Sequence, residues 1–97
     1  MRHRYFVYIL SNNQHTVLYT GVTRDLRRRL TEHREGFSDF TSAYRVHKLV
    51  WFEKHRYVND ARQRERNIKH WSRAWKIDLV NSVNPAWRDL SNEIPFD

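Results

Sequence analysis

The sequence contains no cysteine, and glycine and proline occur only twice each among its 97 residues. Without cysteine the chain has no disulfide, no cysteine-ligated zinc finger and no thiol nucleophile. Disordered chains are rich in glycine and proline, whereas 39% of these residues are hydrophobic and 14% are aromatic. The composition therefore favours a folded domain without cysteine chemistry.

Long hydrophobic runs are also lacking. No run approaches the roughly 18–20 residues that a membrane-spanning helix requires. The apolar stretch at residues 5–10 is too short for the core of a secretory signal, and no small-residue cleavage site follows it. We therefore expect a cytoplasmic protein that does not associate with a membrane.

A chain of 97 residues has room for one hydrophobic core. Chains of this length bury only about 60–65% of the surface that the unfolded chain exposes, which is too little to divide between two cores. We therefore expect residues 1–97 to form a single domain.

Positive charge dominates the composition. The chain has 18 lysines and arginines against 11 acidic residues, a formal net charge of +7. Such an excess attracts polyanions, so nucleic acid is the leading candidate partner. A basic domain whose charge serves only solubility is the alternative.

Three runs rich in aromatic and β-branched residues predict strands at residues 5–10, 17–22 and 46–54. The first two runs are separated by the polar residues 11–15, which is typical of an antiparallel hairpin. Residues 37–45 mix aromatic and polar side chains, and this mixture predicts a loop.

The first helix is expected directly after the hairpin. Thr23 is its predicted N-cap, with Asp25 in the first turn, where the helix dipole favours an anion. The helix should run to about Glu35 and end at Gly36, which can adopt the left-handed conformation of a helix terminus.

Two further helices follow the third strand. One begins near Asn59 or Asp60, and the next has Ser72 as its N-cap and is broken at residues 84–85, Asn-Pro. Trp87 and Leu90 are expected to pack back onto the core as a tail. The resulting order, β-β-α-β-α-α, predicts a small α+β domain in which helices cover a three-stranded sheet.

Two tyrosines on the predicted hairpin are candidate functional residues. Tyr8 and Tyr19 lie eleven positions apart, one on each strand, and Gly21 allows close approach of a ligand or of the backbone. The N-terminus of the first helix beside Gly21 would present N–H groups to an anion. Packing in the core is the alternative role for each tyrosine.

The first helix carries Arg29 and His33, which are four residues apart and therefore share a face. A guanidinium binds a phosphate through two hydrogen bonds, and an imidazole can transfer a proton at the same group. Arg27, Arg28 and Arg34 fit a solvated face better, where they could still contact phosphates. A solvated cationic face is also the alternative for the whole helix.

Glu65 is an acid among cations on the second helix. Its spacing from Ala61 and Ile68 places it on the inward face, while its neighbours in sequence include Arg62 and Lys69. It could neutralise these neighbours. Alternatively it could hold a divalent cation, since magnesium is often bound by one or two carboxylates together with water and phosphate oxygens.

Several segments, taken in order, resemble a known family. They are the triads at residues 6–8, Phe-Val-Tyr, and 19–21, Tyr-Thr-Gly, the stretch 21–33, and the segments 64–73 and 84–90. Together they resemble the GIY-YIG nuclease superfamily, in particular its small single-domain bacterial members, over about residues 4 to 90. Departures from the triads fall at positions that mainly pack the strands, and both tyrosines remain.

The resemblance implies a three-stranded antiparallel sheet flanked by helices and a metal-dependent phosphodiesterase site. By position, Tyr8 would activate the attacking water, Tyr19 would help to orient the water or the phosphate, and Arg29 would stabilise charge on the phosphate. His33 would assist at the same phosphate. Glu65 would be the protein ligand of one divalent ion, Mg²⁺ or Mn²⁺.

The resemblance also implies a late catalytic asparagine, and the positive charge of the helices favours a set of nucleic-acid contacts. Asn84 is assigned to the asparagine role, with Asn81 as the other candidate. The expected contacts to nucleic acid come from the helix cations and the hairpin glycine: Gly21, Arg27, Arg28, Arg62 and Lys69.

Two functions remain open at this point. The first is an endonuclease that hydrolyses phosphodiester bonds in DNA, structured or branched DNA included, and the second is a non-catalytic nucleic-acid-binding module with the same fold. The full set of site residues favours the enzyme, with DNA preferred over RNA and a monomer over an oligomer. A protein–protein adaptor is disfavoured because it has no need for this set.

Overall fold

The computed structural model describes residues 4–36 and 43–95. The elements follow in the order β1 (Tyr5–Ser11), β2 (Leu18–Thr23), α1 (Leu26–Arg34), β3 (Lys48–His55), α3 (Val58–His70), α4 (Arg73–Val83) and the short 3₁₀ helix η1 (Ser91–Glu93). This order confirms the predicted α+β class. The predicted loop at residues 37–45 lies mostly outside the described residues, and residues 43 and 44 at its end are helical.

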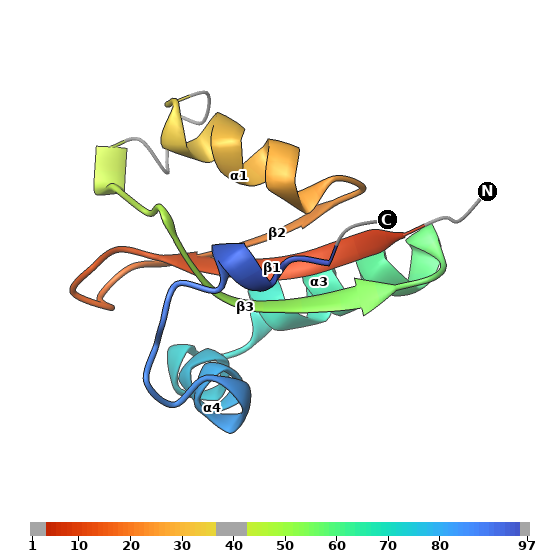
Figure 1. Ribbon diagram of the computed structural model, residues 1–97. Coiled ribbons are helices and arrows are strands. Elements are labelled where there is room, and N and C mark those ends of the chain that lie inside the picture. Colours follow the sequence, from red (N-terminus) through yellow and green to blue (C-terminus); the bar gives the residue numbers. More distant parts are fainter. Residues whose placement is uncertain (1–3, 37–42, 96–97) are drawn as a thin grey trace.

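The three strands form one antiparallel sheet in the order β2-β1-β3, so β1 is the central strand (Figure 1). Tyr8 in the middle of β1 is paired with Gly21 on β2 and with Phe52 on β3. A bulge interrupts the β1–β3 pairing between Ile9 and Leu10. The central position of β1 explains why its sequence is almost continuously apolar: it is covered on both faces and both edges.

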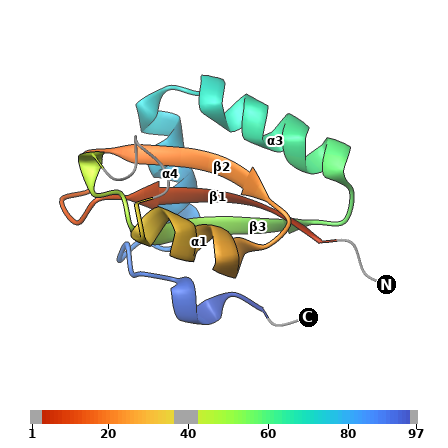
Figure 2. The same ribbon diagram turned by 90° about the horizontal axis from the view of Figure 1, so that it is seen from above.

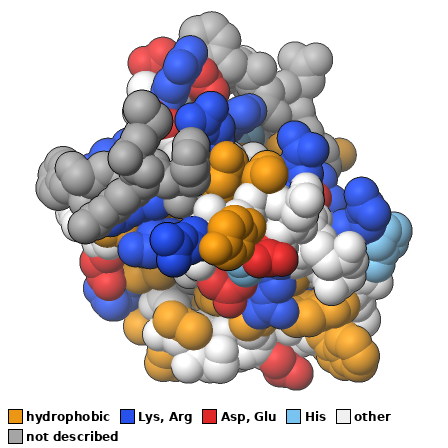
Figure 3. All heavy atoms as spheres, turned by 90° about the vertical axis from the view of Figure 1, so that its right-hand side faces the viewer, with side chains coloured by type: hydrophobic (Ala, Val, Ile, Leu, Met, Phe, Trp, Pro, Cys, Tyr) orange, Lys and Arg blue, Asp and Glu red, His pale blue; other side chains and the backbone are white. Residues whose placement is uncertain are grey.

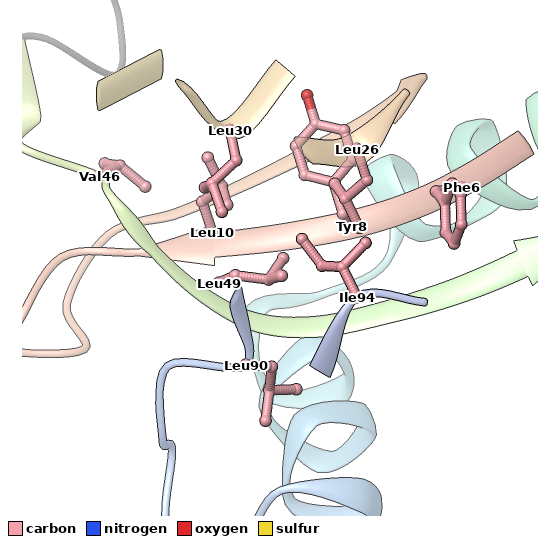
Figure 4. Packing of buried hydrophobic residues seen from close by; sticks show 9 residues of the cluster. All are labelled: Phe6, Tyr8, Leu10, Leu26, Leu30, Val46, Leu49, Leu90 and Ile94. Carbon is pink, nitrogen blue, oxygen red and sulfur yellow. The ribbon is translucent and has the colours of Figure 1, made fainter. Parts of the chain in front are cut away.

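Helices cover both faces of the sheet. In Figures 1 and 2, α1 and the C-terminal tail lie over one face, and α3 and α4 lie over the other. Alternate side chains of β1 enter the two cores, since neighbouring residues of a strand point to opposite faces. The core under α1 contains Phe6, Tyr8 and Leu10 (Figure 4), and the core against α3 and α4 contains Val7 and Ile9.

The N-cap of α1 is Asp25, so the predicted cap at Thr23 is wrong. The Asp25 carboxylate accepts a hydrogen bond from the Arg28 N–H at 3.1 Å. Thr23 remains in the ladder of β2, opposite Phe6, and its hydroxyl accepts the N–H of Asp25 at 3.1 Å. Thr23 therefore stabilises the turn before the helix. The predicted stop is confirmed: Gly36 has a left-handed φ of 82° directly after α1.

Helix α3 begins at Val58, slightly earlier than the predicted start, and its N-cap Tyr57 makes no side-chain capping hydrogen bond. Asp60 instead lies in the first turn, where its charge favours the N-terminus. The predicted cap of α4 is confirmed, since the Ser72 hydroxyl accepts the Trp75 N–H at 3.3 Å. Within the part of the chain that the structure describes, no helix is long and apolar enough to cross a membrane.

The C-terminal tail packs back onto the domain as predicted. Trp87 and Leu90 are buried, and the Leu90 N–H donates to the Leu49 carbonyl at 2.8 Å. Ile94 enters the core under α1 close to Tyr8 (Figure 4). The Arg27 guanidinium donates a hydrogen bond to the Ile94 carbonyl and so joins the tail to α1.

Candidate functional site

Tyr8 is the buried centre of the candidate site. Only 2% of the residue is exposed, and its ring crosses the neighbouring strand at Gly21. A Cβ atom at position 21 would lie 2.5 Å from the Tyr8 Cζ, far inside van der Waals contact. Glycine at this position is therefore what allows the tyrosine hydroxyl to reach over the backbone of β2.

The hydroxyl of Tyr8 meets His33 of α1. The distance from the hydroxyl oxygen to Nε2 of His33 is 2.9 Å, and both groups are buried. His33 lies one turn beyond Leu30, which packs in the same core. Because the two residues share the buried face of α1, packing of this face against the sheet brings the imidazole close to β1. A neutral imidazole with its proton on Nδ1 accepts this hydrogen bond at Nε2.

Tyr19 of β2 completes a group of three rings. Its ring centroid lies 6.3 Å from that of Tyr8 and 5.2 Å from that of His33. The Tyr19 side chain is only partly buried, whereas Tyr8 and His33 are almost fully buried. Tyr19 therefore forms the outer part of the group, where a ligand can reach it.

The protonation states of this group follow from its surroundings. Burial raises the pKa of Tyr8 well above its usual value; Tyr19, Glu65 and Glu32 add to this shift, and Arg29 opposes it. Burial and the Arg29 guanidinium lower the pKa of His33, against a smaller opposing effect of Glu32. At neutral pH Tyr8 therefore carries its proton, and His33 is neutral and able to accept one.

Arg29 lies beside this group on the outer surface of α1. Its side chain is 47% exposed, and its Nε lies 3.5 Å from a carboxylate oxygen of Glu32. The same carboxylate lies 3.3 Å from Nε of Arg28. An exposed pair of this kind is weak, so the guanidinium can exchange Glu32 for a phosphate.

Sequence reasoning missed Glu32. The signal that could have found it was its spacing of three and four residues from two arginines, which places all three side chains on one surface of the helix.

Glu65 lies on α3, which packs against β1 and β2 and runs alongside β2 in Figure 2. Its side chain is only 17% exposed, and one carboxylate oxygen lies 2.6 Å from Nζ of Lys69. Its charge is one of the smaller contributions to the raised pKa of Tyr8. The observed contacts thus join β1, β2 and α1, and α3 contributes Glu65 from the helix that packs against β1 and β2.

The structure does not bring Asn84 to this group. Asn84 is buried on the opposite face of the sheet, where its amide donates to the carbonyls of Val50 at 3.0 Å and Arg88 at 2.9 Å. Its side-chain oxygen accepts the Arg88 N–H at 3.0 Å. The other asparagine considered, Asn81, accepts a hydrogen bond from the Trp87 indole at 2.7 Å. Both side chains therefore form hydrogen bonds that anchor the C-terminal tail.

The expected nucleic-acid contacts separate into two kinds. Gly21 lies under the Tyr8 ring, and Arg27 reaches the tail carbonyl of Ile94, so both have structural roles. Arg28, Arg62 and Lys69 are exposed on α1 and α3. In the space-filling view, lysine and arginine side chains are interspersed with hydrophobic and acidic side chains (Figure 3).

A divalent ion would find few protein ligands at this site. Among the described residues there is no group of three or more histidine, aspartate and glutamate side chains able to hold a metal. Glu65 offers a single, mostly buried carboxylate from α3. One carboxylate fits a magnesium or manganese ion whose other ligands are waters and substrate phosphate oxygens, and it does not fit a closed structural metal site.

Comparison with known proteins identifies the family of the chain. The family model described as the GIY-YIG catalytic domain matches residues 4–78. The chain belongs to the GIY-YIG family. Membership supports nuclease activity, and the matched range contains both tyrosines, Arg29, His33 and Glu65, while Asn84 lies outside it.

The relatives of this GIY-YIG chain are small proteins of similar length. A UPF0213 protein of Syntrophus aciditrophicus is 39% identical over 82 residues, which cover 82% of this chain and 92% of the relative. A UPF0213 protein of Clostridium perfringens is 33% identical, covering 92% of this chain and 96% of the relative. The NMR structure of a UPF0213 protein of Bacillus halodurans matches with a TM-score of 0.58 and 29% identity, covering 89% of this chain and 92% of that one.

Proposed function

We propose that this protein is a metal-dependent endonuclease that hydrolyses phosphodiester bonds in DNA, structured or branched DNA included. The observation that carries the proposal is the buried hydrogen bond between Tyr8 and neutral His33, in a GIY-YIG domain that also contains Arg29 and Glu65. Such a pair can accept a proton from water at neutral pH, whereas an isolated tyrosine cannot.

In this proposal the proton moves in two linked steps. The Tyr8 hydroxyl passes its proton to Nε2 of His33, and the tyrosine oxygen takes a proton from the water that attacks phosphorus. The lowered pKa of His33 keeps the imidazole neutral before the reaction, so the acceptor is ready. Burial opposes a long-lived tyrosinate at Tyr8, which favours transfer of the two protons together.

The charged side chains act on the phosphate. Arg29 exchanges Glu32 for the non-bridging oxygens and stabilises the charge that develops on them. Glu65 would hold the divalent ion, Mg²⁺ or Mn²⁺, which when bound neutralises charge on the leaving oxygen. Arg28, Arg62 and Lys69 attract the neighbouring phosphates of the strand.

A cleavage assay on branched, nicked and single-stranded DNA, with and without Mg²⁺, tests the proposal. We expect Tyr8→Phe, Arg29→Ala and Glu65→Gln each to lower the cleavage rate by about 10²-fold or more, as removal of a group that stabilises the transition state commonly does. Tyr57→Phe, at an exposed tyrosine outside the site, is the matched control and should cleave normally. Cleavage by Glu65→Gln at the wild-type rate would contradict the assigned role.

A nucleic-acid-binding module without catalysis is the second candidate, and the deep burial of Tyr8 is the observation that favours it. The two functions separate in one experiment. If the wild type binds DNA but cleaves none of the substrates with either metal, the protein is a binding module and the endonuclease proposal is wrong.

A further inference from the structure

Trp75 is a large side chain whose exposure the proposed site does not explain. It lies in the first turn of α4 and is 60% exposed. Its ring makes an edge-to-face contact with Trp71 at the end of α3, with 5.9 Å between the centroids. More than half of the residue is therefore exposed to solvent, although burial of a tryptophan side chain is more favourable in free energy than burial of most other side chains.

The surroundings of Trp75 are strongly basic. Residues 61–77 contain one acid, Glu65, and six cations, Arg62, Arg64, Arg66, Lys69, Arg73 and Lys76. Glu65 is mostly buried and already paired with Lys69, and the Arg64 guanidinium pairs with Glu53 at 3.0 Å and lies 5.4 Å above the Trp71 ring. The nearest acid on the other side is Asp78, one turn further along α4. Exposed aromatic rings among cations are the composition of single-strand binding surfaces.

We propose that Trp75 stacks on an unpaired base of a nucleic-acid strand whose phosphates lie along the cations of α3 and the start of α4. The inference rests on the nucleic-acid-binding part of the proposed function and narrows the substrate to nucleic acid with a single-stranded segment. A base in a duplex already stacks on both sides, so an exposed ring can take only an unpaired one.

The position of Trp75 relative to the candidate site determines how many nucleotides would separate the stacked base from that site. Helix α3 leads from the β2 edge of the sheet to α4 (Figure 2), and Trp71 follows Glu65 by six residues, which is about 9 Å along a helix axis. Successive nucleotides of a stacked strand are about 3.4 Å apart. The stacked base would therefore lie about three or more nucleotides from the level of Glu65 along the strand.

A second copy of the chain is the less suitable occupant of this surface. The formal net charge of +7 makes two copies repel each other. The exposed surface of α4 places the polar Asp78, Asn81 and Ser82 among Trp75 and Val83, so the apolar area is interrupted. Stable dimers need about 800 Å² from each partner.

The test measures binding without cleavage, by fluorescence anisotropy in EDTA. The probes are a labelled single-stranded 12-mer, as oligodeoxynucleotide and as oligoribonucleotide, and a blunt duplex of the same sequence. We expect Trp75→Leu to weaken single-strand binding by about 5- to 150-fold, the range that loss of one stacked base gives. Trp75→Phe should retain most of the affinity because a ring remains, and duplex binding should change little in both variants.

Val83→Asn is the matched control, since it removes another exposed apolar side chain from the same helix and should leave binding unchanged. Wild-type affinity of Trp75→Leu for both single strands would overturn the inference and leave the proposed endonuclease intact. Equal weakening on single strand and duplex would also overturn it, and so would a dimer in light scattering that Trp75→Leu converts to monomer. If the wild type binds no probe, the proposed function itself fails.

Discussion

Gly21 determines where the hydroxyl of Tyr8 lies, so this glycine is part of the site without having a side chain. In Gly21→Ala the new Cβ would fall 2.5 Å from the Tyr8 Cζ, and the ring would have to move. We expect the variant to lose about 1–3 kcal/mol of unfolding free energy in urea, the usual cost of overpacking, and to lose cleavage with it. Gly36→Asn is the control, because asparagine tolerates the left-handed backbone there. Unchanged stability of Gly21→Ala would show that Tyr8 can relax at no cost.

His33 makes the stability of the fold depend on pH. Its pKa is lowered in the folded protein, so the unfolded chain binds a proton at this residue more readily. Stability should be fully present above pH 6.5, the ordinary histidine value, and fall as the pH drops through that value toward the lower folded pKa. Urea unfolding at pH 7.5 and 5.5 measures the loss, which should be smaller in His33→Gln. An equal loss in both proteins would assign the effect to other histidines.

Lys69 competes with a metal ion for Glu65, since its ammonium lies 2.6 Å from the carboxylate that would bind the ion. We expect Lys69→Met to bind Mn²⁺ about twofold or more tightly, as removal of one ion pair gives, measured by the signal of unbound Mn²⁺ in electron paramagnetic resonance. Arg66→Met removes an exposed cation from the same helix and controls for general charge. If both variants gain equally, the effect is not local to the pair.

At the scale of elements, the strands and the helix ends with strong signals were predictable. The apolar run of β1, the cap at Ser72 and the glycine after α1 each follow from the residue and its neighbours. The start of α1 was not predictable from the sequence, because Thr23 and Asp25 are both residues that favour an N-cap. Only the pairing of Thr23 with Phe6 in the sheet decides between them. The separation of Asn84 from the tyrosines depends on which face of the sheet α4 covers, and this is set by long-range packing.

Asn84 is expected to act on stability, because it links α4, β3 and the tail through three hydrogen bonds. Asn84→Ala leaves buried carbonyls without partners, and we expect a loss of about 2–3 kcal/mol in urea unfolding, with the cleavage rate of the folded protein retained. Asn81→Ala removes a single hydrogen bond to Trp87 and should lose about 1 kcal/mol. Loss of cleavage in a folded Asn84→Ala would instead support the catalytic role that the family resemblance suggested.

At the scale of the whole molecule, the net charge of +7 is divided between cations that hold the fold and cations that face solvent. Two adjacent arginines of α1 show the division. The Arg27 guanidinium reaches the tail carbonyl of Ile94, whereas the Arg28 side chain is 77% exposed and only loosely paired with Glu32. The two side chains carry the same charge and are neighbours in sequence. Replacing each of them by alanine therefore separates the contribution of charge to the fold from its contribution to binding.

Binding of a DNA duplex should weaken with salt, because each phosphate that a cation neutralises releases counterions. In titrations at several salt concentrations, Arg28→Ala should reduce the slope of log K against log salt by about 0.9, the value for one phosphate contact. Arg27→Ala should keep the wild-type slope and lower the free energy of unfolding, because its hydrogen bond joins the tail to α1. An equal reduction of the slope in both variants would mean that the tail releases Arg27 on binding and that the whole cationic surface of α1 meets the phosphate backbone.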